Sequence, residues 1–506
     1  MFGPTVSNPS AGGLLGGMVY EGYGAGRCNC KFTNTYPLAI GPRLGVAYKI
    51  NAKTVFRGGW GLVYGGTPTG GETTAQGVGW NSLSFPSTSF GNPGAVLRTG
   101  LSYNLADLYS VSLNPGLQPQ AGTITSPPYY QDRNGGRPPR INQWNIGVQR
   151  EVFTNLVVEA AYVGNRGVWL TGNGLMDFNA LTPQRIAAAG LNLNNAADRT
   201  LLTSTMNSST AAARGFNKLP YAGFPATLTV AQSLRPFPQF GTIPIHYAPL
   251  GNTWYDGLQS KLTKRYSHGL VLTGAFTWSK SQTLGAESAT GGGIINDVYN
   301  RQNQKALSVS DQPFVLVITF TYRVPGLGPN RLVRKVTGDW TLSGLATYAS
   351  GSLIQVPGAQ NNLSSLLFRS TNSNRVPGQP LYLTAINGPI DPNKQFVLNP
   401  AAWSDPAPGQ WGFSAPYYSD YRNRRSPNEQ FSMGRIFRFR EKMTFELRAE
   451  FFNAFNRLLL PGVTSTNALA TQTRNAAGVP TSGFGYMNSN SAGGQRNGQL
   501  LARFQF

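Results

Sequence analysis

Residues 443–455 read MTFELRAEFFNAF, and their alternation points to the class of fold. Apolar side chains take every second position and hydroxyl or charged side chains take the positions between, namely Phe445, Leu447, Ala449 and Phe451 against Thr444, Glu446, Arg448 and Glu450. A period of two is that of a β-strand, whose side chains point alternately to opposite faces. The stretch therefore predicts a strand with one apolar and one polar face.

The same alternation recurs along the chain, mostly in pairs of stretches. The stretches are Arg43–Ile50, Thr54–Tyr64, Asn142–Val152, Leu156–Gly164, Trp254–Lys264, Leu270–Ser279, Phe314–Val324, Trp340–Ser350, Phe431–Phe439, Met443–Phe455 and Leu500–Phe506. They predict about 11 or 12 strands, many near the roughly 9 to 11 residues of a tilted membrane strand.

Composition narrows the fold class further. Charged residues make up only 12% of the 506 residues, which leaves little charge to cover a soluble surface. No run approaches the ~20 apolar residues of a membrane helix, since Thr319 interrupts the most apolar stretch, Phe314–Phe320. The other structure that satisfies all backbone groups in lipid is a closed barrel. We expect an all-β fold, a partial transmembrane antiparallel β-barrel in the outer membrane of a Gram-negative bacterium.

The lengths of the connections support a barrel over a soluble β-sandwich, which also alternates. Connections within pairs are mostly short, whereas those between pairs are long: 65–141, 165–253, 282–313, 351–430 and 456–499. Short periplasmic turns and long extracellular loops are typical of outer-membrane barrels, and such loops are uncommon in compact soluble domains. One loop contains a predicted helical turn, with Thr182 as cap and Pro183 at its first position.

The polar face is expected to line the lumen, because a charge facing mid-membrane lipid costs ~2–4 kcal/mol. The candidate lumen-facing residues are Glu159, Lys261, Thr273, Thr319, Ser343, Glu446, Arg448 and Glu450. Arg435 fits this pattern badly, because it shares a face with Met433 and Phe437. It indicates a bulge, a side chain that reaches the interface, or a different register.

Catalysis is not expected. Of the two histidines, His268 lies in a Ser-His-Gly turn and His246 in a loop, and both are interpreted as solvated turn residues. No nucleophile elbow, metalloprotease helix or phosphate loop is present. Cys28 and Cys30 provide no disulfide framework, and C-x-C lacks the second ligand pair of a zinc site. We expect no cofactor, no metal and no enzyme activity.

The net charge of +22 raises the question of a nucleic-acid partner. The basic residues are scattered along the whole chain, and no binding motif accompanies them. A basic lumen and basic loops are the better interpretation, so no nucleic-acid partner is expected.

Several short motifs in order carry a family resemblance over nearly the whole chain. They are Pro42-Arg43-Leu44-Gly45 with Ala47-Tyr48, Gln143-Trp144-Asn145, Ala161 to Gly167 (AYVGNRG), Leu234 to Phe240 (LRPFPQF), Leu258-Gln259 with Lys264-Arg265, Thr277 to Lys280 (TWSK), and Arg448 to Asn456 (RAEFFNAFN). In these motifs the chain resembles the C-terminal barrel region of TonB-dependent receptors of the Oar-like type. The last strand is similar to the signal that barrel-assembly machinery reads, at Leu500, Ala502, Phe504 and Phe506.

The resemblance implies transport of an unidentified solute across the outer membrane, with a plug domain and the TonB complex as partners besides outer-membrane lipid. We expect residues 1–40 to form a loop or partial strand region and residues 41–506 the C-terminal part of the barrel. Set against the family pattern, we expect this sequence to lack the plug domain and the signal peptide, and to supply about half of the family's barrel. The alternatives are a non-transporting surface, adhesion or secretion-associated barrel, or a nonfunctional truncated remnant.

Overall fold

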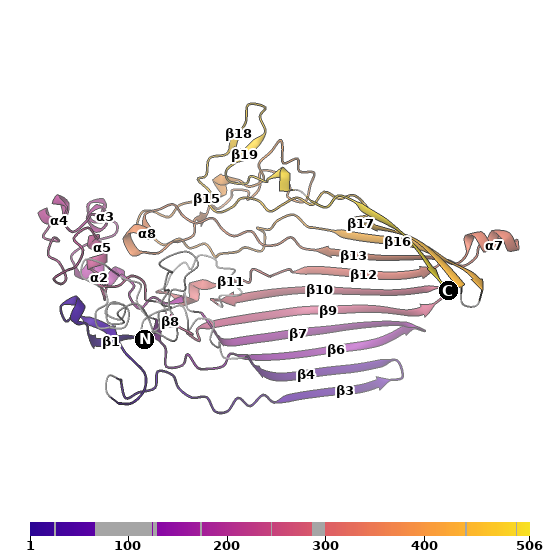
Figure 1. The fold of residues 1–506 in the computed structure, drawn as a ribbon, viewed down its shortest axis with the longest axis horizontal. Coiled ribbons are helices and arrows are strands. Elements are labelled where there is room, and N and C mark those ends of the chain that lie inside the picture. The colour runs from indigo at the N-terminus through magenta and orange to yellow at the C-terminus, as the bar shows by residue number, and fades with distance from the viewer. Residues whose placement is uncertain are drawn as a thin grey trace, which may run out of the picture.

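The computed structural model describes residues 1–24, 27–65, 124, 129–172, 175–243, 245–285, 299–440, 443–491 and 493–506. Its main feature is one large antiparallel sheet, in which strands adjacent in the sheet follow one another along the chain (Figure 1). In sheet order these strands are β3 (Arg43–Asn51), β4 (Thr54–Tyr64), β6 (Arg140–Phe153), β7 (Leu156–Leu170), β9 (Gly251–Ser267), β10 (Leu270–Leu284), β12 (Phe314–Arg323), β13 (Trp340–Ala349), β16 (Asn428–Arg440), β17 (Met443–Phe452) and β20 (Asn497–Gln505). This arrangement confirms the predicted all-β antiparallel fold.

Several strands are longer than predicted. β9 has 17 residues and begins at Gly251, three positions before the predicted start, and β7 continues to Leu170 rather than ending at Gly164. The added residues do not alternate in polarity, yet their backbones still pair, for example Gly167 with Thr253. Alternation reports burial on one face, whereas backbone pairing can continue without it.

Short turns gather at one end of the sheet and long connections at the other (Figure 1). Asn155 and His268 lie in short turns with positive φ angles of 66° and 52°. The connection from β12 to β13 contains helix α7 (Arg331–Thr337), which Asn330 caps by accepting from the amide of Val333. The short connection predicted between the stretches Phe431–Phe439 and Met443–Phe455 includes residues 441 and 442, which lie outside the described residues.

The long connections carry small elements of their own. The helices are α2 (Pro183–Ala188), α3 (Ala196–Thr203), α4 (Ser209–Ala213), α5 (Val230–Ser233) and α8 (Leu363–Leu367), with 3-10 turns η1 (Pro9–Ala11), η4 (Arg301–Gln304), η5 (Pro400–Ala402) and η6 (Ser489–Ser491). The short strands are β1 (Phe2–Ser7), β2 (Leu15–Met18), β5 (Tyr130–Gln131), β8 (Ile245–His246), β11 (Lys305–Leu307), β14 (Asn374–Arg375), β15 (Trp403–Ser404), β18 (Thr473–Arg474) and β19 (Pro480–Ser482). The predicted helical turn is confirmed as α2, and the Thr182 side chain accepts from the amide of Arg185.

The buried apolar residues lie mainly in the long loops rather than in the sheet. One cluster joins Leu201 of α3 to Leu363 of α8, and a second joins Tyr421 to Phe484, so each cluster combines two loops. A third places Phe2 of β1 against Phe240. We call the folded part built by these three clusters the loop cap.

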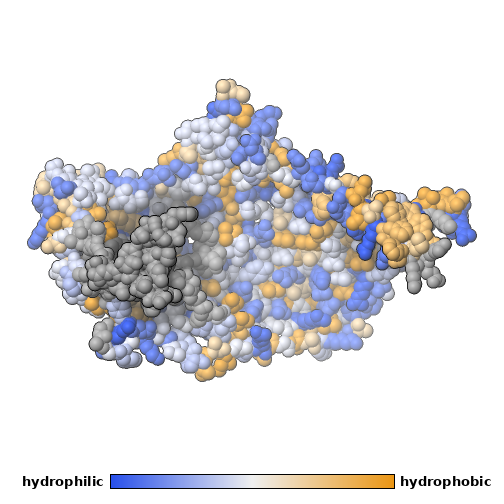
Figure 2. All heavy atoms as spheres, viewed as in Figure 1, coloured by the Kyte–Doolittle hydropathy of each residue, from blue (hydrophilic) through white to orange (hydrophobic). Residues whose placement is uncertain are grey.

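Large apolar side chains of the sheet are exposed instead. Leu44 is 70% exposed, Trp278 64% and Phe504 50%. In Figure 2 apolar residues also gather at the short-turn end, beside α7. An exposed apolar surface of this extent needs surroundings other than water. Within the part of the chain that the structure describes, no helix has the length and apolar character to cross a membrane.

The N-terminal region forms a small structure of its own. β1 and β2 pair as an antiparallel two-stranded sheet. Cys28 and Cys30 are joined by a disulfide, which the sequence analysis did not anticipate. The C-x-C pair is thus a local crosslink, and its sulfur atoms are not free to bind a metal.

Candidate functional site

The strand register places all eight predicted lumen residues on the same face of the sheet. Glu159 of β7 lies opposite Lys261 of β9, and Thr273 of β10 lies opposite Thr319 of β12. Ser343 of β13 lies opposite Ser432, which in turn lies opposite Glu450 of β17. We call this side of the sheet the polar face; the structure brings these residues to one face, though not to one point.

A ladder of charges marks the polar face near the last strand. The Arg448 guanidinium lies 2.8 Å from a carboxylate oxygen of Glu450 and 3.5 Å from one of Glu446. Arg503 of β20 lies opposite Glu446, and the Gln499 side chain donates to Glu450. Acidic and basic groups thus alternate along and across the strands, and each reduces the desolvation cost of its neighbours.

The opposite side, which we call the apolar face, carries the residues of the predicted assembly signal. Leu500, Ala502 and Phe504 lie in β20 opposite apolar residues of β17. Phe506 follows the strand and its ring lies 6.2 Å from that of Phe504. The side chain of Phe506 is 91% exposed, so this end of the sheet presents aromatic rings to its surroundings.

The structure explains why Arg435 lies on the apolar face. The pairing runs through it without a bulge, opposite Trp340 on one side and Leu447 on the other. Its Nη1 donates to the carbonyl of Val336 in α7 at 3.0 Å, and the guanidinium lies over the Phe437 ring at 4.9 Å. The regular pairing leaves no bulge at Arg435, and its charge extends to the short-turn end, as expected for a side chain that reaches the interface.

A second polar group on the apolar face was missed by the sequence analysis. Asp256 of β9 accepts from both the Tyr162 hydroxyl at 2.6 Å and the Arg166 guanidinium at 3.0 Å. Arg166 also lies over the Trp144 ring at 5.2 Å. A paired carboxylate and guanidinium avoid the cost of an isolated charge. The acidic residue at an apolar-face position of β9 was the signal that could have revealed it.

The loop cap contains a buried charge cluster built on the Leu234–Phe240 motif. Arg235 and Asp177, whose side chains are 2% and 1% exposed, are 3.4 Å apart, and Arg369 from another loop lies 2.9 Å from the same carboxylate. Arg235 also donates to the carbonyl of Asn179 at 3.0 Å. Burial lowers the pKa of Arg235 to about 10, and the charge of Asp177 opposes that shift. The cluster therefore ties two loops together.

The same motif also holds the N-terminal hairpin. The Gln239 side chain donates to the carbonyls of Leu15 at 2.8 Å and Gly16 at 3.2 Å, and all three lie in or beside the cap. Addition of a Cβ at Gly16, whose φ is +102°, would place it 2.6 Å from the Phe237 ring. The approach of β2 to the motif thus requires a glycine.

The interpretation of His246 as a solvated turn residue is wrong. Its side chain is 4% exposed, its Nδ1 lies 2.8 Å from the amide oxygen of Gln131, and its ring packs on Tyr129. Burial lowers the pKa of His246 below its usual 6.5. His268 is exposed in its turn, as predicted. Within the described ranges, no group of three or more His, Cys, Asp and Glu side chains is placed to hold a metal ion.

The family follows from comparison with known proteins. Residues 1–499 match the family model of an outer membrane β-barrel domain. The chain belongs to this family, and it is a protein of the bacterial outer membrane. No curated protein sequence matches it.

Solved structures of outer-membrane receptors align with most of this chain. They include the ferric-catecholate import receptor Fiu of Escherichia coli K12, with 10% identity, 97% of this chain and 40% of that chain covered, and a TM-score of 0.36. The ferric enterobactin receptor PfeA of Pseudomonas aeruginosa aligns with 11% identity, 92% and 40% coverage and a TM-score of 0.36. The ferric preacinetobactin receptor BauA of Acinetobacter baumannii aligns with 9% identity, 92% and 36% coverage and a TM-score of 0.34. This chain spans less than half the length of these structures.

Proposed function

We propose that the chain forms the C-terminal part of the barrel of a TonB-dependent transporter that takes up a solute through the outer membrane. The observation that carries the proposal is the register, which collects charged and hydroxyl residues on one face while large apolar side chains are exposed on the other. A barrel in lipid places its apolar face outside and its polar face around a water-filled or plugged interior. The polar face is then the wall of the conduit.

Each group of residues has a role in this proposal. Hydrogen-bonding side chains line the conduit, namely those of Glu159, Lys261, Thr273, Thr319 and Ser343. The ladder Glu446, Arg448 and Glu450 offers fixed charges to a plug domain or to a passing polar solute. The C-terminal strand residues Leu500, Ala502, Phe504 and Phe506 are read by the barrel-assembly machinery. The resemblance to Oar-like receptors implies that the TonB complex provides the energy for transport.

The loop cap favours a second candidate function, that of a surface receptor whose loops bind and whose lumen does not conduct. Two apolar clusters join different loops, and the Asp177 cluster holds Arg235 and Arg369 together. Such a cap is ordered enough to present a fixed surface outside the membrane. This alternative shares the orientation of the sheet and differs only in whether solute crosses.

The orientation is tested by single cysteines in the full-length protein with Cys28→Ser and Cys30→Ser. We expect Thr273→Cys and Thr319→Cys to react with a charged, membrane-impermeant maleimide in native outer membranes. The matched neighbours Leu272→Cys and Phe320→Cys should react only with a lipid-soluble maleimide. Reaction of both sets with the charged reagent at equal rates would reject the assignment of the two faces.

Transport is tested in the source cells by removing this gene or the TonB gene. Solutes left in the medium by each mutant are then compared with the parent strain by mass spectrometry. We expect at least one solute to remain in both mutants, because the proposed uptake needs the barrel and the energy source. If solutes remain in the medium of the TonB mutant but none remains in the medium of the mutant that lacks this gene, the surface receptor would be favoured instead.

A further inference from the structure

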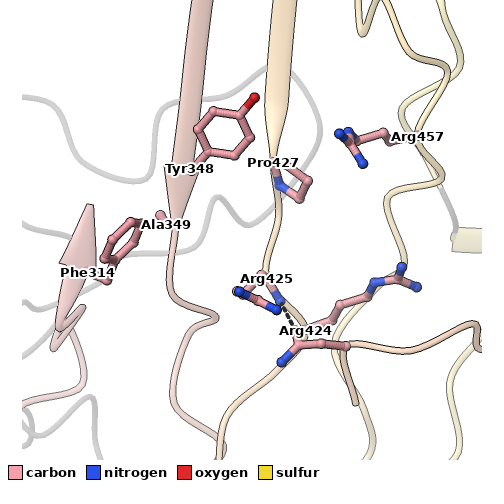
Figure 3. A pocket seen from close by; sticks show the side chains of 8 residues that line it. Phe314, Tyr348, Ala349, Arg424, Arg425, Pro427 and Arg457 are labelled. Atoms are coloured by element: carbon pink, nitrogen blue, oxygen red, sulfur yellow. Dashed lines mark hydrogen bonds between the residues drawn. The ribbon is translucent and has the colours of Figure 1, made fainter. Parts of the chain in front are cut away.

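Three arginines surround a pair of adjoining cavities where the last strands meet the loop cap. The first cavity, of about 290 Å³, has among its lining residues Phe314, Tyr348, Arg424, Arg425, Pro427 and Arg457. The second, of about 430 Å³, shares Arg424, Arg425, Pro427 and Arg457. Figure 3 shows Arg424 and Arg425 on the segment that leads into β16, and Arg457 on a neighbouring segment.

These cavities open on the apolar face, at the loop end of the sheet. Leu316 lies on the apolar face, and its register partner in β13 is Tyr348. Phe314 lies two positions before Leu316 in the same strand, so both aromatic side chains point to the apolar face. Glu429 of β16, opposite Ala346, shares this face and is fully buried. Nearby Trp278, opposite Phe314, is 64% exposed. Exposed aromatic rings at this level are typical of the boundary between hydrocarbon and headgroups.

The charges of the cavities are unbalanced. Arg457 is fixed by Glu429, whose carboxylate accepts from its Nε at 3.0 and 2.9 Å. Asp391, which lines the second cavity, pairs with Lys394 at 3.1 Å. Neither Arg424 nor Arg425 forms an ion pair with any residue in the described ranges, and only the backbone amide of Arg425 is held, by the Asn387 side chain at 3.0 Å. Two guanidinium groups thus remain available to an external anion.

We propose that this site binds the phosphate group of an anionic lipid of the outer leaflet. A guanidinium presents two parallel N–H donors that match the oxygen atoms of a phosphate, so Arg424 and Arg425 can bind it bidentately. The location favours a lipid over a soluble molecule as the source of the phosphate. A lipid can place its headgroup at the cavities while its acyl chains lie along the apolar face beside Phe314 and Trp278. A soluble phosphate has no apolar part to contact these rings.

The proposal rests on the proposed orientation of the two faces, which the cysteine labelling tests separately. If the labelling succeeds and lipid binding fails, only the lipid site is wrong. If the labelling fails, both are wrong.

The test uses the full-length protein, purified in detergent, and native mass spectrometry with added lipid A. The probes are phosphorylated lipid A, enzymatically dephosphorylated lipid A and inorganic phosphate. The test variant is Arg424→Gln with Arg425→Gln, because Arg457 is the partner of a buried carboxylate and its loss would disturb folding. The matched control is Lys218→Gln with Arg496→Gln, which also removes two positive charges, at exposed positions that line neither cavity.

We expect phosphorylated lipid A to bind the parent and the control equally, and to bind the test variant at least roughly tenfold more weakly, since each charge-assisted bond lost is a factor of about ten. Unchanged heat-modifiable migration in gels shows that the variant barrel is folded. Equal binding of dephosphorylated lipid A, or unchanged binding by the test variant, would overturn the proposal. Displacement of the lipid by millimolar inorganic phosphate would also overturn it and identify a site for free phosphate.

Discussion

Replacement of Arg235 by methionine should loosen the loop cap without disturbing the sheet. The substitution removes the donor to the Asn179 carbonyl and the 3.4 Å ion pair with Asp177. Loss of one partner of a buried pair costs about 3–5 kcal/mol. Arg369 still lies 2.9 Å from Asp177, so the lower limit of about 3 kcal/mol is expected.

The measurement is hydrogen exchange by mass spectrometry on the full-length protein in detergent. A loss of about 3 kcal/mol should speed exchange of protected amides in residues 175–243 roughly a hundredfold, while strand amides remain unchanged. Arg185→Met is the control, because Arg185 also donates to a backbone carbonyl, that of Leu234, but from an exposed position. Its cost should stay near 1 kcal/mol, about the value of one hydrogen bond. Unchanged exchange in the Arg235→Met cap would refute the view that this buried pair holds two loops together.

Three further predictions concern other parts of the chain. Phe320→Arg places a charge on the apolar face and should destabilise the barrel by about 2–4 kcal/mol, whereas Thr319→Arg should cost much less, as measured by the urea midpoint of heat-modifiable migration. Phe506→Ser should lower the amount of assembled protein in the outer membrane but not its synthesis, which immunoblots of membrane and total fractions will show; equal membrane levels would contradict a role in assembly. The pKa of His246 in the folded protein lies below 6.5, so its contribution to stability is fully present above pH 6.5. As the pH falls from 6.5 toward the folded pKa, the local free energy of unfolding should decrease by up to about 1.4 kcal/mol per pH unit. The protection factors of residues 245–248, which correct for the intrinsic effect of pH on amide exchange, should therefore fall on acidification, and His246→Gln should remove this dependence.

The sheet could be predicted because its two faces meet different environments, and alternation in sequence is the direct result. The pairing of Glu159 with Lys261 follows from a register that the turns and the alternation fix together. Strand ends could not be predicted, since residues such as Gly167 pair by their backbones outside the alternating region. Arg435 was correctly recognised as exceptional, but its acceptor in α7 lies 99 positions away.

The loop cap could not be predicted because its contacts join segments far apart in sequence. The LRPFPQF motif was recognised only by resemblance, and its buried partner Asp177 lies 58 positions from Arg235. His246 was assigned to solvent because nothing local in the sequence indicates that the ring packs beside Tyr129. The arginine cavities combine Arg424 and Arg425 with Arg457, which neither period nor spacing brings together.

The shared core of the loop cap sets an order of events during biogenesis. Leu201 lies in the connection between β7 and β9, whereas its cluster partner Leu363 lies in the connection between β13 and β16. A hydrogen bond from the Gln410 side chain to the Asn194 side chain joins the same two connections, and the two residues lie 216 positions apart in sequence. Neither loop can bury its apolar residues until both hairpins have been threaded across the membrane, and contacts of such long range form slowly. Closure of the cap is therefore a late step, and an arrested precursor should be recognisable by protease-sensitive loops above an already paired sheet.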